Sequence, residues 1–197
     1  MNAARLILKS VHHGNTRAVA ERIAKILGAP ITDPDESLPS CLSDARLIGF
    51  GSGIYYGRFH RSLRRWIANL PNDYGVGRLA FVYSTSGLPF LSAIYHRPLV
   101  RALERRGFEV VGEFACRGHD SFGPLWLVGG INRKHPDADD LSRAESFASG
   151  LARLAREQFP SIQVPSIQGP SIQLGAERSS AKQKRPGLSP TGIPANR

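Results

Sequence analysis

The sequence predicts an α/β fold in which a parallel sheet carries helices on both faces. Short apolar runs alternate along the chain with amphipathic helical patterns, as in sheets built from strand–helix–strand units. Glycine or proline residues stand at the ends of several predicted helices, where they cap or stop a helix. Small polar residues follow four of the predicted strands. Because ligands of parallel sheets bind at the carboxyl ends of the strands, these residues form a candidate site.

The amino-terminal half of the chain contains three predicted strands and two predicted helices. The second helix shows apolar residues at helical spacing in Leu63, Trp66, Ile67 and Leu70. The first has a similar stripe that begins at Val19. In order, the elements are a buried strand over 6–11, a helix capped by Gly28, a minimal strand over 30–32, a strand over 46–51 and a helix stopped by Pro71.

The carboxyl-terminal half continues the alternation. A strand is predicted over 79–83 and a helix after Pro98 that closes at Gly107. A strand over 110–116 and a last helix over 141–159 follow. Acidic residues just before that helix, Asp139 and Asp140, suit a helix amino terminus.

Composition indicates one domain and an intracellular setting. The chain has 197 residues, 41% of them hydrophobic, which suits a single sizeable core. Cys41 and Cys116 are far apart and have no metal-ligand spacing, so we expect two structural thiols in a reduced, cytoplasmic environment. No secretory signal or membrane-spanning stretch is apparent.

The last part of the chain, residues 160–197, is predicted to be a disordered tail, and residues 1–159 the folded domain. Pro-Ser-Ile-Gln occurs three times in the tail, at 160–163, 165–168 and 170–173, and proline, glycine, serine and lysine dominate the remaining residues. The formal charge of +10 divides between the two parts, because five basic residues and one acidic residue from Pro160 onward leave +6 for the domain. A basic tail of this kind can contact anionic surfaces.

The loop over 10–16 has the composition of a phosphate-binding turn. It reads Ser-Val-His-His-Gly-Asn-Thr and joins the first predicted strand to the first predicted helix. Backbone N–H groups and hydroxyls in such a loop can point at an anion, and the helix dipole favours negative charge there. The alternative is an ordinary strand-to-helix turn, which uses the same residue types.

Three further polar loops are predicted at the same edge of the sheet. They span 51–60, 84–90 and 116–124 and are rich in glycine, serine and aromatic residues. Glycines let backbone amides approach a ligand, and Tyr55, Tyr56 or Phe90 can cover a flat ring. A ring joined to a phosphate by a polar chain is flavin mononucleotide (FMN), which we expect as the ligand. The alternative is that these tyrosines are ordinary packing residues.

The chain resembles the flavodoxin-like family over residues 4–159. The resemblance rests on HHGNT at 12–16, GSGIY at 51–55 and the pattern CxGxDxxGP…GGINxxHPxxxDL over 116–141. It implies a doubly wound sheet of five parallel strands in the order 2-1-3-4-5, with helices on both faces. It also implies that FMN is bound without a covalent link.

The resemblance further implies a set of FMN-binding residues. The phosphate would be held by Ser10, His12, His13, Gly14, Asn15 and Thr16. The ribityl chain and ring would be lined by Ser52, Gly53, Ile54, Tyr55, Tyr56, Gly57, Ser84, Thr85, Ser86 and Gly87. The ring or its rim would lie near Arg117, Gly118 and Asp120. Many flavodoxins carry a hydroxyl residue where Val11 and His13 stand here, so one phosphate hydrogen bond is lost or replaced by imidazole.

Other kinds of site have little support in the sequence. The histidines show no metal-ligand spacing, and we expect no metal; a partly protonated His13 would favour a phosphate dianion. No Ser-His-Asp order, paired carboxylates in a rim loop or phosphatase-type cysteine loop is present, so hydrolase chemistry is not expected. No catalytic residue is assigned, and the candidates nearest the expected ring are Tyr56, His119 and Asp120.

Three functional classes remain open. The first is a flavin-dependent oxidoreductase, similar to quinone reductases or protoporphyrinogen-oxidising members of the superfamily, that passes electrons or hydride to a quinone-like, porphyrin-type or protein partner. Arg58 and Arg117, if near the ring, would stabilise the anionic reduced flavin. The second is a simple electron carrier, which is expected to be acidic, whereas this domain is basic. The third is a cofactor-free interaction module.

Overall fold

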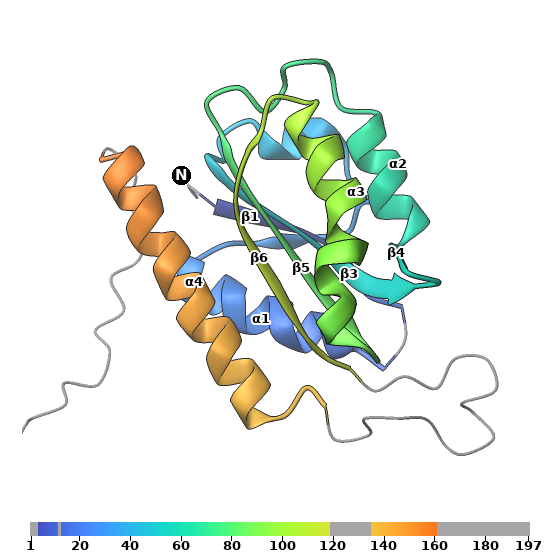
Figure 1. Cartoon of the computed structure of the whole chain (residues 1–197). Coiled ribbons are helices and arrows are strands. Elements are labelled where there is room, and N and C mark those ends of the chain that lie inside the picture. Colours follow the sequence, from blue (N-terminus) through green and yellow to red (C-terminus); the bar gives the residue numbers. More distant parts are fainter. Residues whose placement is uncertain (1–3, 12, 119–134, 161–197) are drawn as a thin grey trace, which may run out of the picture. The chain divides into compact units, whose positions relative to one another are not determined.

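The computed structural model describes residues 4–11, 13–118 and 135–160. Strands and helices alternate along this part of the chain, with two short 3₁₀ turns, η1 and η2 (Figure 1). The elements are β1 (Ala4–Lys9), α1 (Asn15–Leu27), β2 (Ile31–Thr32), η1 (Pro39–Leu42), β3 (Leu47–Tyr55), β4 (Arg58–Phe59), α2 (Arg61–Ala68), β5 (Leu79–Ser86), η2 (Pro89–Leu91), α3 (Ser92–Glu104), β6 (Glu109–Arg117) and α4 (Ala138–Gln158).

The sheet contains five parallel strands in the order β2-β1-β3-β5-β6, and the short strand β4 pairs antiparallel with β3. This confirms the predicted doubly wound order 2-1-3-4-5, with β4 as an addition. The register aligns Lys9 of β1 with Ser52 of β3, and Gly53 of β3 with Thr85 of β5. All five parallel strands therefore end at one edge of the sheet.

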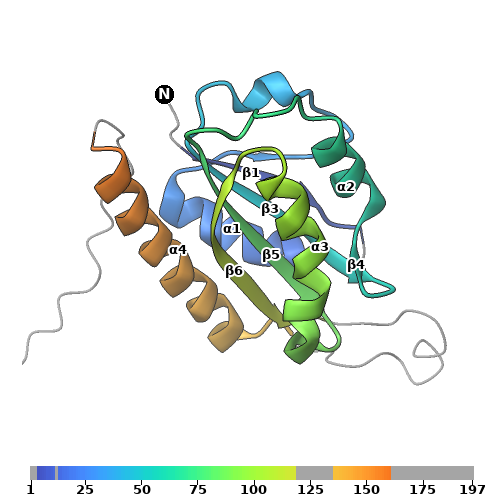
Figure 2. The ribbon, with the colours of Figure 1, turned by 45° about the horizontal axis from the view of Figure 1, so that its top comes forward.

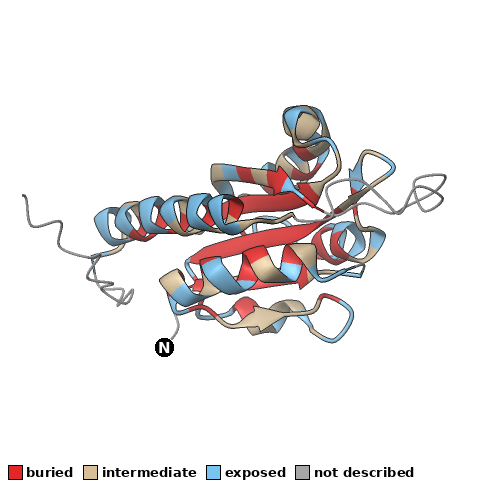
Figure 3. Cartoon of the chain, turned by 90° about the horizontal axis from the view of Figure 1, so that it is seen from below, coloured by how far each residue is buried: buried red, intermediate tan, exposed pale blue. Residues whose placement is uncertain are grey.

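Helices cover both faces of the sheet. α1 and α4 lie on one face, and α2 and α3 lie side by side on the other (Figures 1 and 2). Alternate residues of β1 show the division, because Leu6 and Leu8 belong to the core under α1 and α4, whereas Ile7 belongs to the core under α2 and α3. Both cores are fully buried at their centres, so the strands form a continuous buried band between the helix layers (Figure 3).

Two strands are longer than the sequence pattern predicts. β3 continues through the Gly-Ser-Gly-Ile-Tyr segment, for which the pattern predicts a loop, because Ser52 and Gly53 pair with the neighbouring strands and Tyr55 pairs with Arg58 of β4. β5 continues to Ser86 in the same way, paired with β6. The loops at this edge are thus shorter, and their backbones are held by the sheet.

The last two helices begin earlier than predicted. α3 starts at Ser92 and contains Pro98 in its interior, whereas the sequence pattern predicts a start after that proline. Pro98 is exposed, and the helix continues past it because His96, Leu99 and Leu103 are buried beneath the helix. α4 begins at Ala138 because Asp137 caps it with a capping box.

Among the described helices, none has the length and apolar character needed to cross a bilayer. The predicted tail lies outside the described residues from position 161 onward.

Candidate functional site

Four strands bring the predicted site residues to one edge of the sheet, which we call the rim. It is formed where β1, β3, β5 and β6 end. The register aligns Ser52 with Ser84 and Ser86 with Arg117 across neighbouring strands. The structure therefore places the described members of the predicted set at this edge. His12 and Asp120, and the acid–base candidate His119, lie outside the described residues.

The amino terminus of α1 faces the rim without a side-chain cap. His13 and Gly14 have left-handed backbones, with φ of 54° and 67°, and Gly14 is the N-cap residue. Gly14 has no side chain with which to cap the helix, and no acidic residue lies in the first turn, so the amino-terminal end of the helix dipole is not offset by a carboxylate of that turn. A Cβ added at Gly14 would meet nothing within 4 Å. This end of α1 can accept an anion such as a phosphate.

Thr16 and Thr85 tie the first loop to the end of β5. Their hydroxyl oxygens are 2.8 Å apart, and both side chains are buried. Gly118 completes the junction, because its N–H donates to the Ser86 carbonyl at 3.0 Å. A Cβ at Gly118 would lie 3.1 Å from the Asn15 amide nitrogen. The Thr16 hydroxyl thus holds neighbouring loops together, and its backbone N–H is the group that can face an anion.

Two predicted site serines, Ser52 and Ser84, point into the protein interior. The Ser52 hydroxyl donates to the Gly53 carbonyl at 2.7 Å and accepts the His60 N–H at 2.9 Å. The Ser84 hydroxyl lies 2.7 Å from Nε2 of His96. Both side chains are fully buried. Their hydroxyls stabilise the ends of β3 and β5, and their backbones pair with the neighbouring strands, so these two serines support the rim rather than line it.

Ser84, His96 and Glu113 form a hydrogen-bonded chain that no sequence pattern indicates. Nδ1 of His96 lies 2.9 Å from a Glu113 carboxylate oxygen, on the far side of the ring from Ser84. The connectivity is that of a hydrolase triad. Because the Ser84 side chain is buried beneath α3, no substrate can reach its hydroxyl. Burial lowers the pKa of His96, and the nearby Glu113 carboxylate opposes that effect.

The turn between β3 and β4 presents an exposed aromatic ring. Tyr56 and Gly57 both have positive φ, 51° and 71°, as in a two-residue type I′ hairpin. A tyrosine in this conformation is strained, yet Tyr56 is 85% exposed. Tyr55 instead folds back over Gly53, where a Cβ would lie 3.0 Å from the Tyr55 hydroxyl. Tyr56 is therefore not part of the core, and most of its ring is open to solvent at the rim.

Exposed apolar side chains concentrate at the rim. Seven large hydrophobic residues among those described are exposed, and five of them follow the end of a strand. These five are Val11, Tyr56, Leu88, Phe90 and Ile94. Exposed apolar groups gathered in one place mark an interaction site more often than scattered ones do. The rim therefore combines the amino terminus of α1 with exposed apolar surface.

The two arginines expected near the ring line different cavities. Arg58 lines a cavity with Val11, Tyr55 and Tyr56. Arg117 lies on the other flank of the rim, in a cavity that also involves Phe90. The structure brings Arg58 together with Tyr55 and Tyr56, and it brings Arg117 together with Phe90.

The amino terminus of α4 holds the only group of three potential metal ligands among the described residues. His135, Asp137 and Asp140 place their ligand atoms within 4.8 Å of one another. Nδ1 of His135 lies 2.7 Å from Asp140, which also pairs with Arg143 at 3.4 Å. Asp137 and Asp140 form the α4 capping box. These contacts explain the group as a helix cap.

Burial keeps the two thiols in their protonated form. Both cysteines are free in the described structure. Burial raises the pKa of Cys116 to about 12 and also raises the pKa of Cys41. Both side chains therefore stay protonated near neutral pH.

Comparison with known proteins agrees with this architecture. A family model described as a flavodoxin domain matches residues 6–85, from β1 to the end of β5. An uncharacterized protein of Methanocaldococcus jannaschii is 39% identical over 150 residues, which cover 76% of this chain and 98% of the relative.

Solved structures share the fold at low identity. The oxidised Flavodoxin 2 of Bacillus cereus has a TM-score of 0.59 at 18% identity and covers 77% of this chain and 98% of its own. Rubredoxin oxygen:oxidoreductase of Desulfovibrio gigas has a TM-score of 0.61 at 14% identity, over 80% of this chain and 37% of that protein. With the family match, the relative and the sheet order in agreement, the chain belongs to the flavodoxin-like family.

Proposed function

We propose that this chain binds FMN non-covalently at the rim and serves as a redox protein that exchanges electrons with a partner. The observation that carries the proposal is the pairing of two features on one edge. The amino terminus of α1 has no side-chain cap, and the strained Tyr56 stands exposed at the same rim. A phosphate fits the first feature, and the face of a flavin ring fits the second.

The residues present suit the two ends of FMN. His13, Gly14, Asn15 and Thr16 would surround the phosphate, with backbone N–H groups of α1 as donors. Tyr56 and its neighbour Arg58 would lie against the ring or its edge, since they line one cavity. Bound FMN would supply the reversible uptake of electrons. An arginine near the ring favours its anionic reduced form by charge attraction, and Arg58, which lines the same cavity as Tyr56, is placed for that role.

The proposal favours a protein partner. The flavodoxins and the rubredoxin oxygen:oxidoreductase that share the fold carry names that refer to redox proteins. In this chain the exposed apolar side chains at the rim, including Leu88 and Ile94, extend beyond the residues expected to line the ring. Such surface is suited to docking a second protein.

The first test is a visible absorption spectrum of the purified full chain, with the released cofactor identified by mass. We expect a yellow protein that releases FMN. The apo form should bind FMN more tightly than riboflavin, which lacks the phosphate. A colourless protein that fails to bind added FMN would contradict the proposal and leave the cofactor-free interaction module.

The second test replaces the exposed ring. Tyr56→Asn should weaken FMN binding by about tenfold through lost ring contact, whereas asparagine tolerates the positive φ at this turn. Thermal unfolding of the apo protein should stay unchanged. Val76→Asn is the matched control, because Val76 is 64% exposed and precedes β5 at the opposite edge of the sheet. Equal FMN affinity in both variants would exclude Tyr56 from the site.

A further inference from the structure

The two helix layers of the molecule carry different charge. Residues 58–68 and 92–106, which comprise β4, α2, α3 and the two residues after α3, contain eight arginines and one acidic residue, Glu104. The opposite layer, α1 and α4, contains six basic and five acidic residues. The positive charge of the domain is therefore concentrated on one side. We call this side the arginine face; it consists of Arg58, Arg61, Arg64, Arg65, Arg97, Arg101, Arg105 and Arg106.

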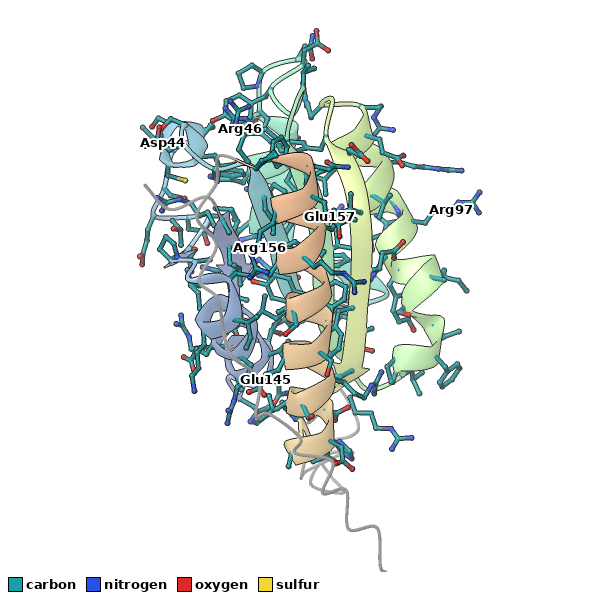
Figure 4. The ribbon with its side chains drawn as sticks, turned by 90° about the vertical axis from the view of Figure 1, so that its left-hand side faces the viewer. Asp44, Arg46, Arg97, Glu145, Arg156 and Glu157 are labelled. Carbon is teal, nitrogen blue, oxygen red and sulfur yellow. The ribbon has the colours of Figure 1, made fainter. Side chains whose placement is uncertain are left out.

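The arginine face is not neutralised within the described structure. Salt bridges join Lys9 to Asp33, just after β2, and also join α1 to α4 and residues within α4. Among the described residues, no salt bridge joins one of these eight arginines to a carboxylate. Seven of the eight are exposed, and Figure 4 shows Arg97 extending from α3 away from the fold. Uncompensated like charge destabilises a folded protein, so its concentration here indicates an external counter-charge.

Three grooves connect the arginine face to the rim. The first begins at Tyr56 on the rim and reaches Arg64. A second groove, between α2 and α3, shares Arg64 and reaches Arg105. The third runs along α3 from Arg105 to Ile94. Seven of the eight arginines line these three grooves, together with two carboxylates, Asp73 and Glu113.

The residues that line the three grooves indicate the kind of partner that would bind there. Arginine binds carboxylates through two parallel hydrogen bonds, and arginine with exposed aromatic residues is the composition typical of protein interfaces. We propose that the arginine face, together with the exposed apolar residues of the rim, docks a redox partner protein whose contact surface is acidic. This inference rests on the proposed redox function, because it names the partner of the same site. Docking at this surface would bring the partner to the edge where FMN is proposed to bind.

The test measures docking without depending on the flavin. The full chain is titrated into a fluorescently labelled ferredoxin of low isoelectric point, at low salt, and anisotropy gives the dissociation constant. A labelled c-type cytochrome of high isoelectric point serves as the charge-reversed probe. We expect the ferredoxin to bind, its affinity to fall as salt rises, and the cytochrome not to bind.

Paired variants locate the surface. Arg97→Gln with Arg101→Gln should raise the dissociation constant for ferredoxin by about tenfold. Arg153→Gln with Arg156→Gln removes the same charge from α4, on the opposite layer, and should change it less than about twofold. Equal losses in both double variants, or cytochrome binding as tight as ferredoxin binding, would overturn the proposal.

A nucleic acid is the competing partner for a basic surface with exposed aromatic residues. The same proteins are therefore titrated into a labelled single-stranded DNA of about 20 nucleotides, a length that spans one or two typical binding sites. Tighter binding of DNA than of ferredoxin, lost in the Arg97 and Arg101 variant, would reject an acidic protein as the partner. Ferredoxin docking by a chain that binds no FMN would instead refute the redox function and leave the docking surface standing.

Discussion

Single residues at the rim and beneath it have roles set by burial. Thr16, Ser52 and Ser84 have the polar side chains expected of a phosphate or flavin site, but all three are buried and hydrogen-bonded within the fold. Tyr56 is the opposite case, a ring that the backbone holds outward at a conformational cost. Residue type alone therefore does not separate ligand contacts from supports; exposure does.

His96 makes folding stability depend on pH. Its pKa in the folded protein is lowered by burial, whereas an unfolded chain has a histidine pKa of about 6.5. As pH falls through about 6.5, His96 becomes protonated in the unfolded chain but stays neutral in the folded protein. The free energy of unfolding therefore decreases toward acid pH. One proton gives a slope of at most about 1.4 kcal/mol per pH unit. Urea unfolding between pH 7.5 and 5 measures it.

His96→Gln isolates that contribution. The variant should be less stable than the parent at pH 7.5, by about 1–3 kcal/mol, because buried hydrogen bonds to Ser84 and Glu113 are disturbed. Its stability should also depend less on pH. His60, whose pKa burial lowers too, remains in both proteins. The exposed Val76, changed to Asn, carries no titrating group; it is the control and should keep the parent's slope. Identical slopes in His96→Gln and the parent would contradict this assignment.

At the scale of elements, β3 and β5 fit together through glycines opposite aromatic rings. A Cβ at Gly49 would lie 2.4 Å from the Phe81 ring, and one at Gly51 would lie 2.1 Å from the Tyr83 ring. The rings cross over the neighbouring strand and fill the core under α1. The buried hydroxyl of Tyr83 has no hydrogen-bond partner among the described residues. Glycine is required here for close approach.

Gly51→Ala tests this strand contact. The new methyl group would overlap a ring that is buried on all sides, so we expect a loss of at least about 2 kcal/mol in the free energy of unfolding. Gly150→Ala is the matched control in α4, because a Cβ there meets nothing within 4 Å. It should stabilise the protein by up to about 1 kcal/mol through higher helix propensity. Similar effects of the two substitutions in urea unfolding would refute the role assigned to Gly51.

At the scale of the whole molecule, the sheet separates two cores and two kinds of surface. Both cores consist of residues between Ala4 and Phe159. The charge asymmetry has the same origin, because the topology places α2 and α3 on one face of the sheet. About thirty residues separate the first turns of these two helices in the chain. The surface proposed for docking is thus a property of the topology.

A chain ending at Pro160 tests whether the domain is complete without the remaining residues. Because the described cores draw on nothing beyond Phe159, the free energy of unfolding should stay within about 0.5 kcal/mol of the full chain, the range of changes outside cores. Urea unfolding at neutral pH measures it. A loss larger than about 1 kcal/mol would show that residues 161–197 contribute to the fold.

The order and type of the main elements, the cap at Gly28 and the meeting of the candidate site loops at one edge of the sheet could all be predicted from the sequence. These signals are local, because apolar spacing and turn residues act over a few positions. The tertiary structure was needed to show that Ser84 bonds His96 and that α3 runs through Pro98. It was also needed to show that arginines from two helices share one surface. Such features depend on strand register and on packing between distant segments, which local patterns do not encode.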